Sequence, residues 1–244
     1  MFFDRWRRAW LEAAGSLLYP PHCAACGIPV APRAGVLCHA CRRARRRLTG
    51  ARCAVCSQPF GGALTADFRC MNCGDLDFAF DFATAAYRSR GVVRDLIHQF
   101  KYNRRLHLRH LLARMLSEGF RDGRMSLSPP QVIVPVPLHP TRKREREFNQ
   151  AEVLARLAGA RLGLPVTDIL QRRRYTLTQT HFDREERLAN LEGAFGLKTG
   201  AEVAGRHLAL VDDVLTTGST ADACARVLRE AGAATVIVIT VARG

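Results

Sequence analysis

Several features are missing from this sequence of 244 residues, and each absence excludes a class of protein. No run of about 18 apolar residues is present, which argues against a membrane-spanning helix. The first residues carry several charges, including Arg5, Arg7 and Arg8, so we expect no signal peptide. Neither GxxxxGK[ST] nor a GxGxxG after a strand occurs, which argues against P-loop and dinucleotide-binding proteins. We therefore expect a cytoplasmic protein.

Acidic residues are also scarce relative to basic ones. The chain has 22 Asp and Glu against 37 Lys and Arg, which gives a net charge of +15. This balance indicates an anionic partner: a nucleic acid, an anionic membrane surface or phosphorylated ligands. The hydrophobic content of 48% supports a folded core, and the length allows one large or two small domains.

Residues 207–220 form the most informative stretch. Its first five residues predict a buried strand, after which Asp212 and Asp213 follow as adjacent carboxylates. A turn rich in hydroxyls comes next: Thr216, Thr217, Gly218, Ser219 and Thr220. Residues 219–231 are rich in helix formers, and the β-branched residues 234–242 predict a second buried strand. In such a unit the turn lies at the carboxyl end of a strand, where ligands bind.

The chemistry of this turn suits a ribose 5-phosphate. Gly218 permits a positive φ, and the free N–H groups and dipole of the following helix favour a phosphate. Asp212 and Asp213 would accept charge-assisted hydrogen bonds from the hydroxyls of the attached sugar. The alternative is a purely structural turn with a capped helix, because Ser, Thr and Asp are common caps.

Eight of the nine cysteines form four Cys-x2-Cys pairs before residue 74: Cys23, Cys26, Cys38, Cys41, Cys53, Cys56, Cys70 and Cys73. Without a secretory signal, this spacing favours metal over disulfides. Eight thiolates supply about two structural zinc ions at four per metal. Two successive ribbons and a cross-braced pairing satisfy the same count. His22 and His39 are not expected to be ligands, and Cys224 is expected to be a small buried side chain.

Two charged or amphipathic segments allow two interpretations each. Residues 1–19 predict an amphipathic helix that either packs on its own domain or contacts a partner or membrane surface. Residues 42–47 contain five arginines, which form either a contact with a phosphate backbone or a solvated helix face. Further elements are predicted as a strand over 78–87, helices over 91–100 and 106–120, a strand over 131–139 that ends in prolines, and a helix from about 149 to 163.

Residues 210–220 resemble the phosphoribosyl-diphosphate (PRPP) motif of type I phosphoribosyltransferases. The wider chain is similar to the ComF family in the order of Lys101-Tyr102, residues 134–139, Arg146 with residues 148–151, Gln179, Arg187 with Asn190, and the PRPP motif. The cysteine-rich head resembles the double zinc ribbon of that family. The resemblance implies an α/β fold: a type I phosphoribosyltransferase-like parallel-sheet domain at 78–244, preceded by an amphipathic helix and double zinc ribbon at 1–77.

The resemblance also implies roles for residues. Asp212 and Asp213 would be catalytic, residues 216–220 would hold the 5-phosphate, and Val136, Pro137, Leu138 and Arg146 would contact the diphosphate of PRPP with Mg2+. Residues 172–195 resemble a mobile flap, with a surface hairpin as the alternative. The family usually has Gly where this chain has Glu147, which affects the backbone path and adds a negative charge.

Two functions follow from the resemblance. The first is binding of PRPP or a ribose 5-phosphate nucleotide, with phosphoribosyl transfer to an acceptor that the sequence does not indicate. The second is a non-catalytic accessory that binds single-stranded DNA during natural transformation. In either case a competence helicase at the inner face of the membrane is an expected partner.

Overall fold

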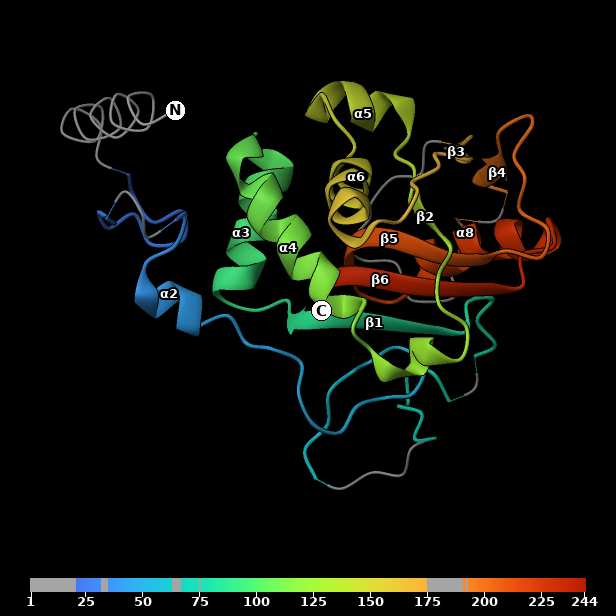
Figure 1. Cartoon of the computed structure of the whole chain (residues 1–244), viewed down its shortest axis with the longest axis horizontal. Helices are drawn as coiled ribbons and strands as arrows, with labels where there is room; N and C mark the ends of the chain where they lie inside the picture. The colour runs from blue at the N-terminus through green and yellow to red at the C-terminus, as the bar shows by residue number, and fades with distance from the viewer. Residues whose placement is uncertain (1–20, 32–34, 63–66, 75, 175–190, 192) are drawn as a thin grey trace, which may run out of the picture.

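The computed structural model describes residues 21–31, 35–62, 67–74, 76–174, 191 and 193–244. The predicted N-terminal helix and most of the predicted flap therefore lie outside the described residues. At the centre is a four-stranded parallel sheet in the order β1-β6-β5-β2 (Figure 1). The strands are β1 (Phe82–Arg88), β2 (Val132–Pro135), β5 (His207–Leu215) and β6 (Thr235–Arg243). The expected α/β parallel-sheet class is confirmed.

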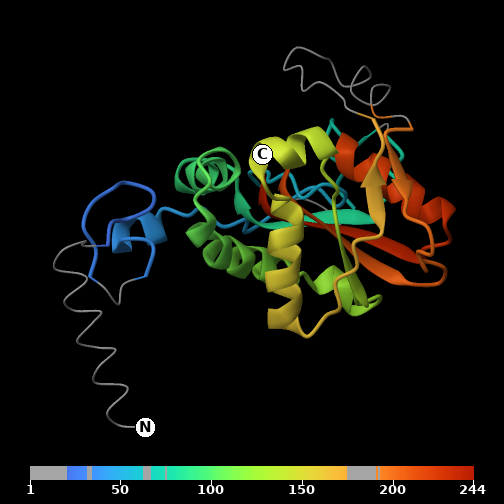
Figure 2. The same cartoon turned by 90° about the horizontal axis from the view of Figure 1, so that it is seen from above.

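Apolar side chains on both faces of the sheet are covered by different elements. One face packs against the helices α3 (Val92–Tyr102), α4 (Arg109–Gly119) and α6 (Gln150–Leu162). The other packs against α8 (Ser219–Glu230) and a hairpin of β3 (Leu170–Arg172) and β4 (Phe195–Leu197). Figure 2 shows α6 and α8 on opposite sides of the strands. Continuous β-branched runs such as β6 follow from this double coverage.

Shorter elements complete the described chain. They are α2 (His39–Arg43), η1 (Leu106–Leu108), η2 (Gly123–Ser126) and α5 (Pro140–Arg146). The helix predicted over 106–120 is thus divided into η1 and α4. No helix was predicted at α5, where Pro140 occupies the first helical turn and His139 Nδ1 accepts a hydrogen bond from Thr141 N at 3.3 Å. Proline suits the start of a helix because its missing N–H is not needed there.

The position of the two acids differs from the prediction. Asp212 and Asp213 were expected to follow the strand, but β5 continues to Leu215. The reason is the neighbouring strand, since β6 stays paired with β5 up to Leu215 and Arg243. The acids are therefore part of the sheet, and adjacent residues of a strand point to opposite faces.

The segment between the two groups of cysteines runs along the free edge of β1. Leu48 N donates to Ala86 O at 2.9 Å, and Arg88 N donates to Arg46 O at 2.9 Å. Arg47 and Tyr87 form an antiparallel bridge between these bonds. The cysteine-rich region is thus hydrogen-bonded to the sheet, while the division into domains at residue 77 stays a prediction. Among the described helices, none is long and apolar enough to cross a bilayer.

Candidate functional site

The hydroxyl-rich turn connects β5 to α8 at the carboxyl edge of the sheet. Gly218 is the N-cap of α8 with φ of 87°, and a Cβ at this position would lie 3.4 Å from the ring of Phe78. Thr217 Oγ1 and Ser219 Oγ are 3.0 Å apart. The N–H groups of the first helical turn point towards the loop, as at the start of any α-helix. Gly218 has no side chain that could cap them. A small cavity of about 50 Å³ lies here, lined by Asp212, Val214, Leu215, Thr216, Thr217, Gly218, Ser219, Thr220, Ala221 and Val238.

Asp213 points to the face covered by α3. It is 3% exposed, and its Oδ2 atom lies 2.5 Å from Nζ of Lys101, the penultimate residue of α3. Its Oδ1 atom accepts a hydrogen bond from Val214 N at 3.0 Å. Burial lowers the pKa of Lys101, the negative charge of Asp212 raises it in part, and Arg146 and Arg142 lower it further. Asp213 therefore fixes a lysine at the sheet edge and does not line the small cavity.

Asp212 points to the opposite face and lines the cavity beside the loop. Burial raises its pKa to about 6, although the positive charges of Lys101, Arg146 and Arg172 act in the opposite direction. These cations come from α3, α5 and β3, which are far apart in the sequence. One carboxylate and a loop suited to a phosphate thus lie together at this edge, and three cations act electrostatically on that carboxylate, which suits a ligand with both hydroxyls and phosphates.

The loop after β2 lies next to β5. Val136 N donates to Val211 O at 2.9 Å, and Val136 O accepts from Asn149 Nδ2 at 3.0 Å. Asn149 also caps α6 through a bond from Ala151 N to its Oδ1 atom. Val136 and the loop that follows it are thereby held beside β5, and the diphosphate role of residues 136–138 stays a prediction.

Arg146 ends α5 and contacts α3. Its Nη2 atom lies 3.3 Å from Tyr102 Oη, and its guanidinium carbon is 4.9 Å from the centre of the Tyr102 ring. The next residue, Glu147, adopts the left-handed conformation with φ of 68°. This explains why Gly is usual at this position, since only Gly takes this conformation without steric cost. Glu147 Oε1 is paired with Arg104 Nη1 at 2.9 Å, which offsets its negative charge.

Lys101 and Tyr102 were noted in the sequence for their order only, and no site role was predicted for them. The available signal was a lysine at the end of an amphipathic helix that otherwise buries apolar residues. At the base of the predicted flap, β3 and β4 form an antiparallel pair, and Arg172 stacks on Phe195 with 5.2 Å between its guanidinium carbon and the ring centre. Cys224 is fully buried, as expected.

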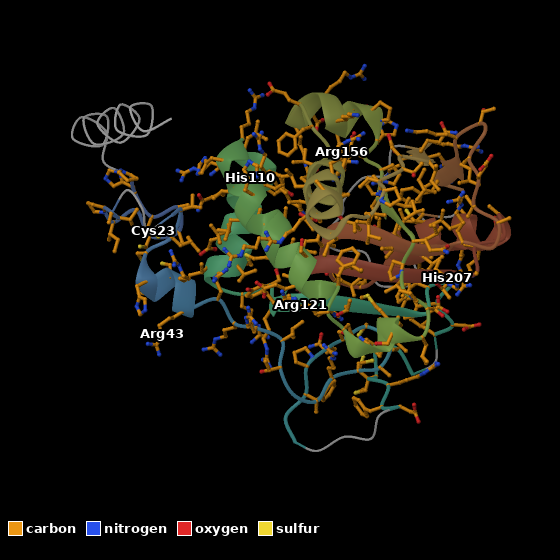
Figure 3. The ribbon with its side chains drawn as sticks, in the orientation of Figure 1. Cys23, Arg43, His110, Arg121, Arg156 and His207 are labelled. Atoms are coloured by element: carbon orange, nitrogen blue, oxygen red, sulfur yellow. The ribbon has the colours of Figure 1, made fainter. Side chains whose placement is uncertain are left out.

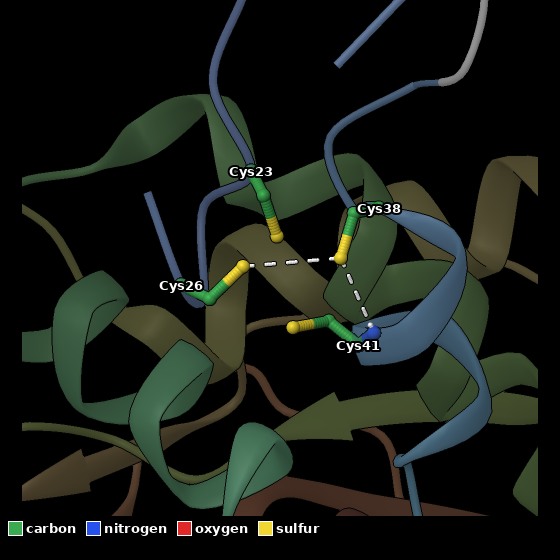
Figure 4. A group of neighbouring side chains, drawn as sticks. All are labelled: Cys23, Cys26, Cys38 and Cys41. Carbon is green, nitrogen blue, oxygen red and sulfur yellow. Dashed lines mark hydrogen bonds between the residues drawn. The ribbon is translucent and has the colours of Figure 1, made fainter. Parts of the chain in front are cut away.

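The eight paired cysteines form two separate clusters. The first cluster contains Cys23, Cys26, Cys38 and Cys41, and the second contains Cys53, Cys56, Cys70 and Cys73. In each cluster the four sulfurs lie within 4.8 Å of one another. Figure 4 shows the first cluster with its sulfurs turned towards a common centre. Each cluster takes its four cysteines from one continuous half of the region, so the chain forms two successive ribbons and not a cross-braced pair. His22 and His39 belong to neither cluster.

The spacing of the sulfurs fits zinc. A tetrahedral ion with Zn–S bonds of about 2.3 Å places sulfurs roughly 3.8 Å apart. The distance is 3.8 Å between Cys26 and Cys38 and 3.7 Å between Cys56 and Cys70. Within the second cluster, a hydrogen bond with Cys73 and the guanidinium of Arg243 lower the pKa of Cys56 to about 4, whereas burial and the charge of Cys56 raise the pKa of Cys70. Both clusters therefore fit structural zinc ions, each with four protein ligands and no open position.

A second hollow lies between the first ribbon (residues 21–43) and the helices α4 and α6. This groove has a volume of about 630 Å³, and it is lined by Gly35, Val36, Leu37, Arg42, Arg45, Arg47, His110, Leu111, Ala113, Arg114, Glu118, Leu157 and Arg161. Figure 3 labels one residue on either side, Cys23 in the first ribbon and His110 in α4. Among the lining residues that the structure describes, Glu118 is the one carboxylate, and it is paired with Arg47 at 2.6 Å. The groove is therefore strongly basic.

Comparisons with known proteins agree with both halves of the chain. A family model described as a double zinc ribbon domain matches residues 14–77, and one described as a phosphoribosyl transferase domain matches residues 149–244. DNA utilization protein YhgH of Salmonella typhimurium is 34% identical over 91% of this chain and 96% of its own length. Competence protein F of Haemophilus influenzae is 36% identical over 61% of this chain and 66% of its own. Competence protein ComFC of Streptococcus pneumoniae is 31% identical over 65% and 67%.

Proposed function

Because the chain belongs to the ComF family of competence and DNA utilization proteins, we propose that it binds PRPP or a ribose 5-phosphate nucleotide at the carboxyl edge of its sheet. The names of these relatives support a role in DNA uptake. The observation that carries the proposal is that Asp212 lies beside the loop 216–220 and that three cations act on it electrostatically. The phosphoribosyl transferase model supports it, because it includes β5 and the loop.

Each part of this edge has a role in the proposal. Asp212 accepts hydrogen bonds from the ribose hydroxyls, while residues 216–220 and the first turn of α8 hold the 5-phosphate. The backbone of residues 136–138 and the side chain of Arg146 hold the diphosphate. Asp213 is buried against Lys101, so its role is to keep that ammonium beside the diphosphate. Mg2+ bound with PRPP would neutralise part of the diphosphate charge.

Phosphoribosyl transfer is the reaction that such a site would support. The bond from C1 of the ribose to the diphosphate breaks, the diphosphate leaves with the electron pair, and an acceptor then bonds to C1. Positive charge develops on the ribose during this step, and the carboxylate of Asp212 stabilises it.

Calorimetry with three ligands tests the proposal. PRPP with Mg2+, ribose 5-phosphate and ribose are titrated into the wild-type chain, into Asp212→Asn and into Thr217→Val. The Asn variant should bind all three ligands about tenfold to a hundredfold more weakly, because all carry the ribose hydroxyls and an amide loses charge-assisted hydrogen bonds worth about 1.5 to 3 kcal/mol. Thr217→Val should weaken only the ligands that carry the 5-phosphate.

Asp95→Asn is the matched control, since Asp95 is exposed on α3 and lies outside the proposed site. Its affinities should equal those of the wild type. Wild-type affinity for PRPP in Asp212→Asn would refute the ribose site. Binding of PRPP without turnover by any offered base would restrict the function to ligand binding.

The basic groove favours a second candidate function, the binding of single-stranded DNA. Five arginines from three parts of the chain line it, and Arg42, Arg45 and Arg47 belong to the arginine run singled out in the sequence. None of the lining residues that the structure describes is aromatic, and the five arginines among them would contact phosphates of the strand. DNA affinity should therefore be sensitive to salt and nearly independent of sequence.

Two variants of equal charge separate the groove from the net charge. Arg114→Ala with Arg161→Ala removes two arginines that line the groove, whereas Arg43→Ala with Arg46→Ala removes two exposed arginines that do not. The first pair should flatten the slope of log affinity against log salt by about 0.7 for each lost phosphate contact. The second should change it much less. Equal changes in both pairs would mean that only net charge matters.

Family membership also supports the proposal of a competence helicase as partner and of contact with the inner face of the membrane. Size-exclusion chromatography of the chain mixed with a purified competence helicase tests the first point, and sedimentation with anionic vesicles tests the second. Elution of the chain and the helicase in separate peaks would refute the first proposal. A chain that stays in the supernatant after sedimentation would refute the second.

A further inference from the structure

Arg243, at the end of β6, connects the second cysteine cluster with the end of β5, where the loop 216–220 begins. It is only 6% exposed. Its Nε atom donates to the backbone oxygen of Cys56 at 2.9 Å, and its Nη2 atom lies 3.5 Å from the Cys56 sulfur. Its Nη1 atom donates to Leu215 O at 3.1 Å. One guanidinium thus joins a ligand of the second cluster to the last residue of β5.

A buried guanidinium requires a partner with negative charge. Among the residues that the structure describes, no Asp or Glu side chain forms an ion pair with Arg243, although its Nη1 atom also donates to Gly244 O at 2.6 Å. The second cluster provides that partner, because four thiolates around one Zn2+ leave an excess of negative charge. The zinc site and Arg243 therefore stabilise each other, as outer partners of metal ligands commonly do.

Leu215 is the residue from which the chain enters the loop 216–220. Its carbonyl oxygen accepts from Arg243 Nη1 and also from Gly244 N at 2.8 Å. These two bonds fix the direction in which the loop leaves the sheet. The Arg243 contact can therefore alter the position of the groups proposed to hold the 5-phosphate.

The chain that follows the second ribbon (residues 52–74) supports the same loop from behind. A Cβ at Gly218 would lie 3.4 Å from the ring of Phe78 and 3.7 Å from that of Phe80. Asp222, in the first turn of α8, accepts a hydrogen bond from Ala79 N at 2.7 Å. Since residues 78–80 come soon after Cys73, the folding of the second ribbon bears on the loop at two points.

We propose that Arg243 is a positioning residue through which the second cluster, when it holds zinc, sets the affinity of the loop 216–220 for a 5-phosphate. The proposal rests on the proposed ribose 5-phosphate site and assigns it a dependence on one of the two zinc sites. Coupling between binding sites is reciprocal, so a ligand at the loop must strengthen zinc binding at the second cluster by the same factor.

Equilibrium competition for zinc measures this coupling without altering Arg243. The full zinc-loaded chain is titrated with a chromophoric chelator, with and without saturating ribose 5-phosphate. Cys26→Ser and Cys56→Ser assign the two zinc affinities to the first and second clusters. Ribose 5-phosphate should raise the zinc affinity of the second cluster by about fivefold or more and leave that of the first unchanged. Equal effects on both clusters, or none on the second, would overturn the proposal.

A pair of variants then tests Arg243 itself. Arg243→Lys retains the positive charge but cannot bridge Cys56 and Leu215, because lysine lacks the forked donors of arginine. Calorimetry should show about tenfold weaker binding of ribose 5-phosphate, with both zinc ions retained. Arg124→Lys is the control, since Arg124 joins the second ribbon to β1 through Ser57 Oγ and Ala83 O but does not contact Leu215.

Arg124→Lys should bind ribose 5-phosphate like the wild type. An equal loss of affinity in both variants would show general loosening of the ribbon and overturn the role of Arg243. If the wild-type chain binds no ribose 5-phosphate, the proposed function fails together with this inference. If it binds and zinc affinity is unchanged by the ligand, only the coupling fails.

Discussion

Replacing Lys101 by Met should destabilise the fold, because it leaves the carboxylate of Asp213 buried without its partner. The side chains are 21% and 5% exposed, and Nζ and Oδ2 are 2.5 Å apart. Breaking a buried pair from one side costs about 3 to 5 kcal/mol. Since part of Lys101 reaches water, solvent would offset some of this cost, and we expect a loss of about 2 to 3 kcal/mol in the free energy of unfolding.

Urea unfolding measures this loss through a lower midpoint at an unchanged slope. Lys198→Met is the matched control, since Lys198 and Asp168 form a pair of similar length, 2.6 Å, whose side chains are 43% and 33% exposed. That control should lose less than about 1 kcal/mol. Adding Asp213→Asn to Lys101→Met should recover about half of the stability, because no uncompensated charge remains. A loss in Lys101→Met no larger than in Lys198→Met would refute the reasoning.

Three further predictions concern Glu147, Asp212 and the cysteines. Glu147→Gly should raise the free energy of unfolding by about 1 kcal/mol, which would appear as a higher Tm. The steric strain removed at φ of 68° should exceed the stability lost with the exposed ion pair to Arg104. An unchanged or lower Tm would contradict this prediction. The pKa of Asp212 is raised to about 6, so affinity for ribose 5-phosphate should increase as pH rises through 6. Asp212→Asn should reduce that increase to the part that comes from the second ionisation of the 5-phosphate, whose pKa is also about 6. The pKa of Asp212 is about 6 in the folded chain and 3.8 as its ordinary value, so between pH 3.8 and about 6 the folded chain binds more protons than the unfolded chain. The contribution of Asp212 to the free energy of unfolding should therefore fall as pH rises from 3.8 to about 6. Metal analysis should give about two zinc ions per chain and about one in Cys26→Ser or Cys56→Ser; two ions retained in either variant would exclude that cysteine as a ligand.

The sequence was most informative where the chemistry is local in the chain. The Cys-x2-Cys spacing predicted the two clusters, because one turn presents two sulfurs to the same centre. Residues 216–220 predicted the turn between β5 and α8, because the glycine and hydroxyl residues that favour such a turn are adjacent in the sequence. The limits of β5 were not predictable in this way, because pairing with β6, and not the local residues, extends the strand past Asp213.

Contacts between distant segments were also missed. Lys101 reaches Asp213 only because α3 packs across the sheet, and no local pattern marks that lysine. Arg243 was not singled out in the sequence, although it joins Cys56 to Leu215. The loop at Glu147 was identified by a departure from the family pattern, and its physical reason, a left-handed backbone, became visible only in the structure.

The segment along β1 has a consequence for fragments and fusions of this chain. Residues 46–48 occupy hydrogen-bonding groups of the outer strand that would otherwise be open to another chain. A fragment that starts at residue 78 would expose that edge, together with apolar residues such as Phe80 and Ala83 that pack with the second ribbon. Exposed edges of this kind pair with other copies and promote aggregation. Residues 46–48 and the second ribbon therefore keep the edge and apolar residues of the sheet covered, and fragments of the chain should retain both.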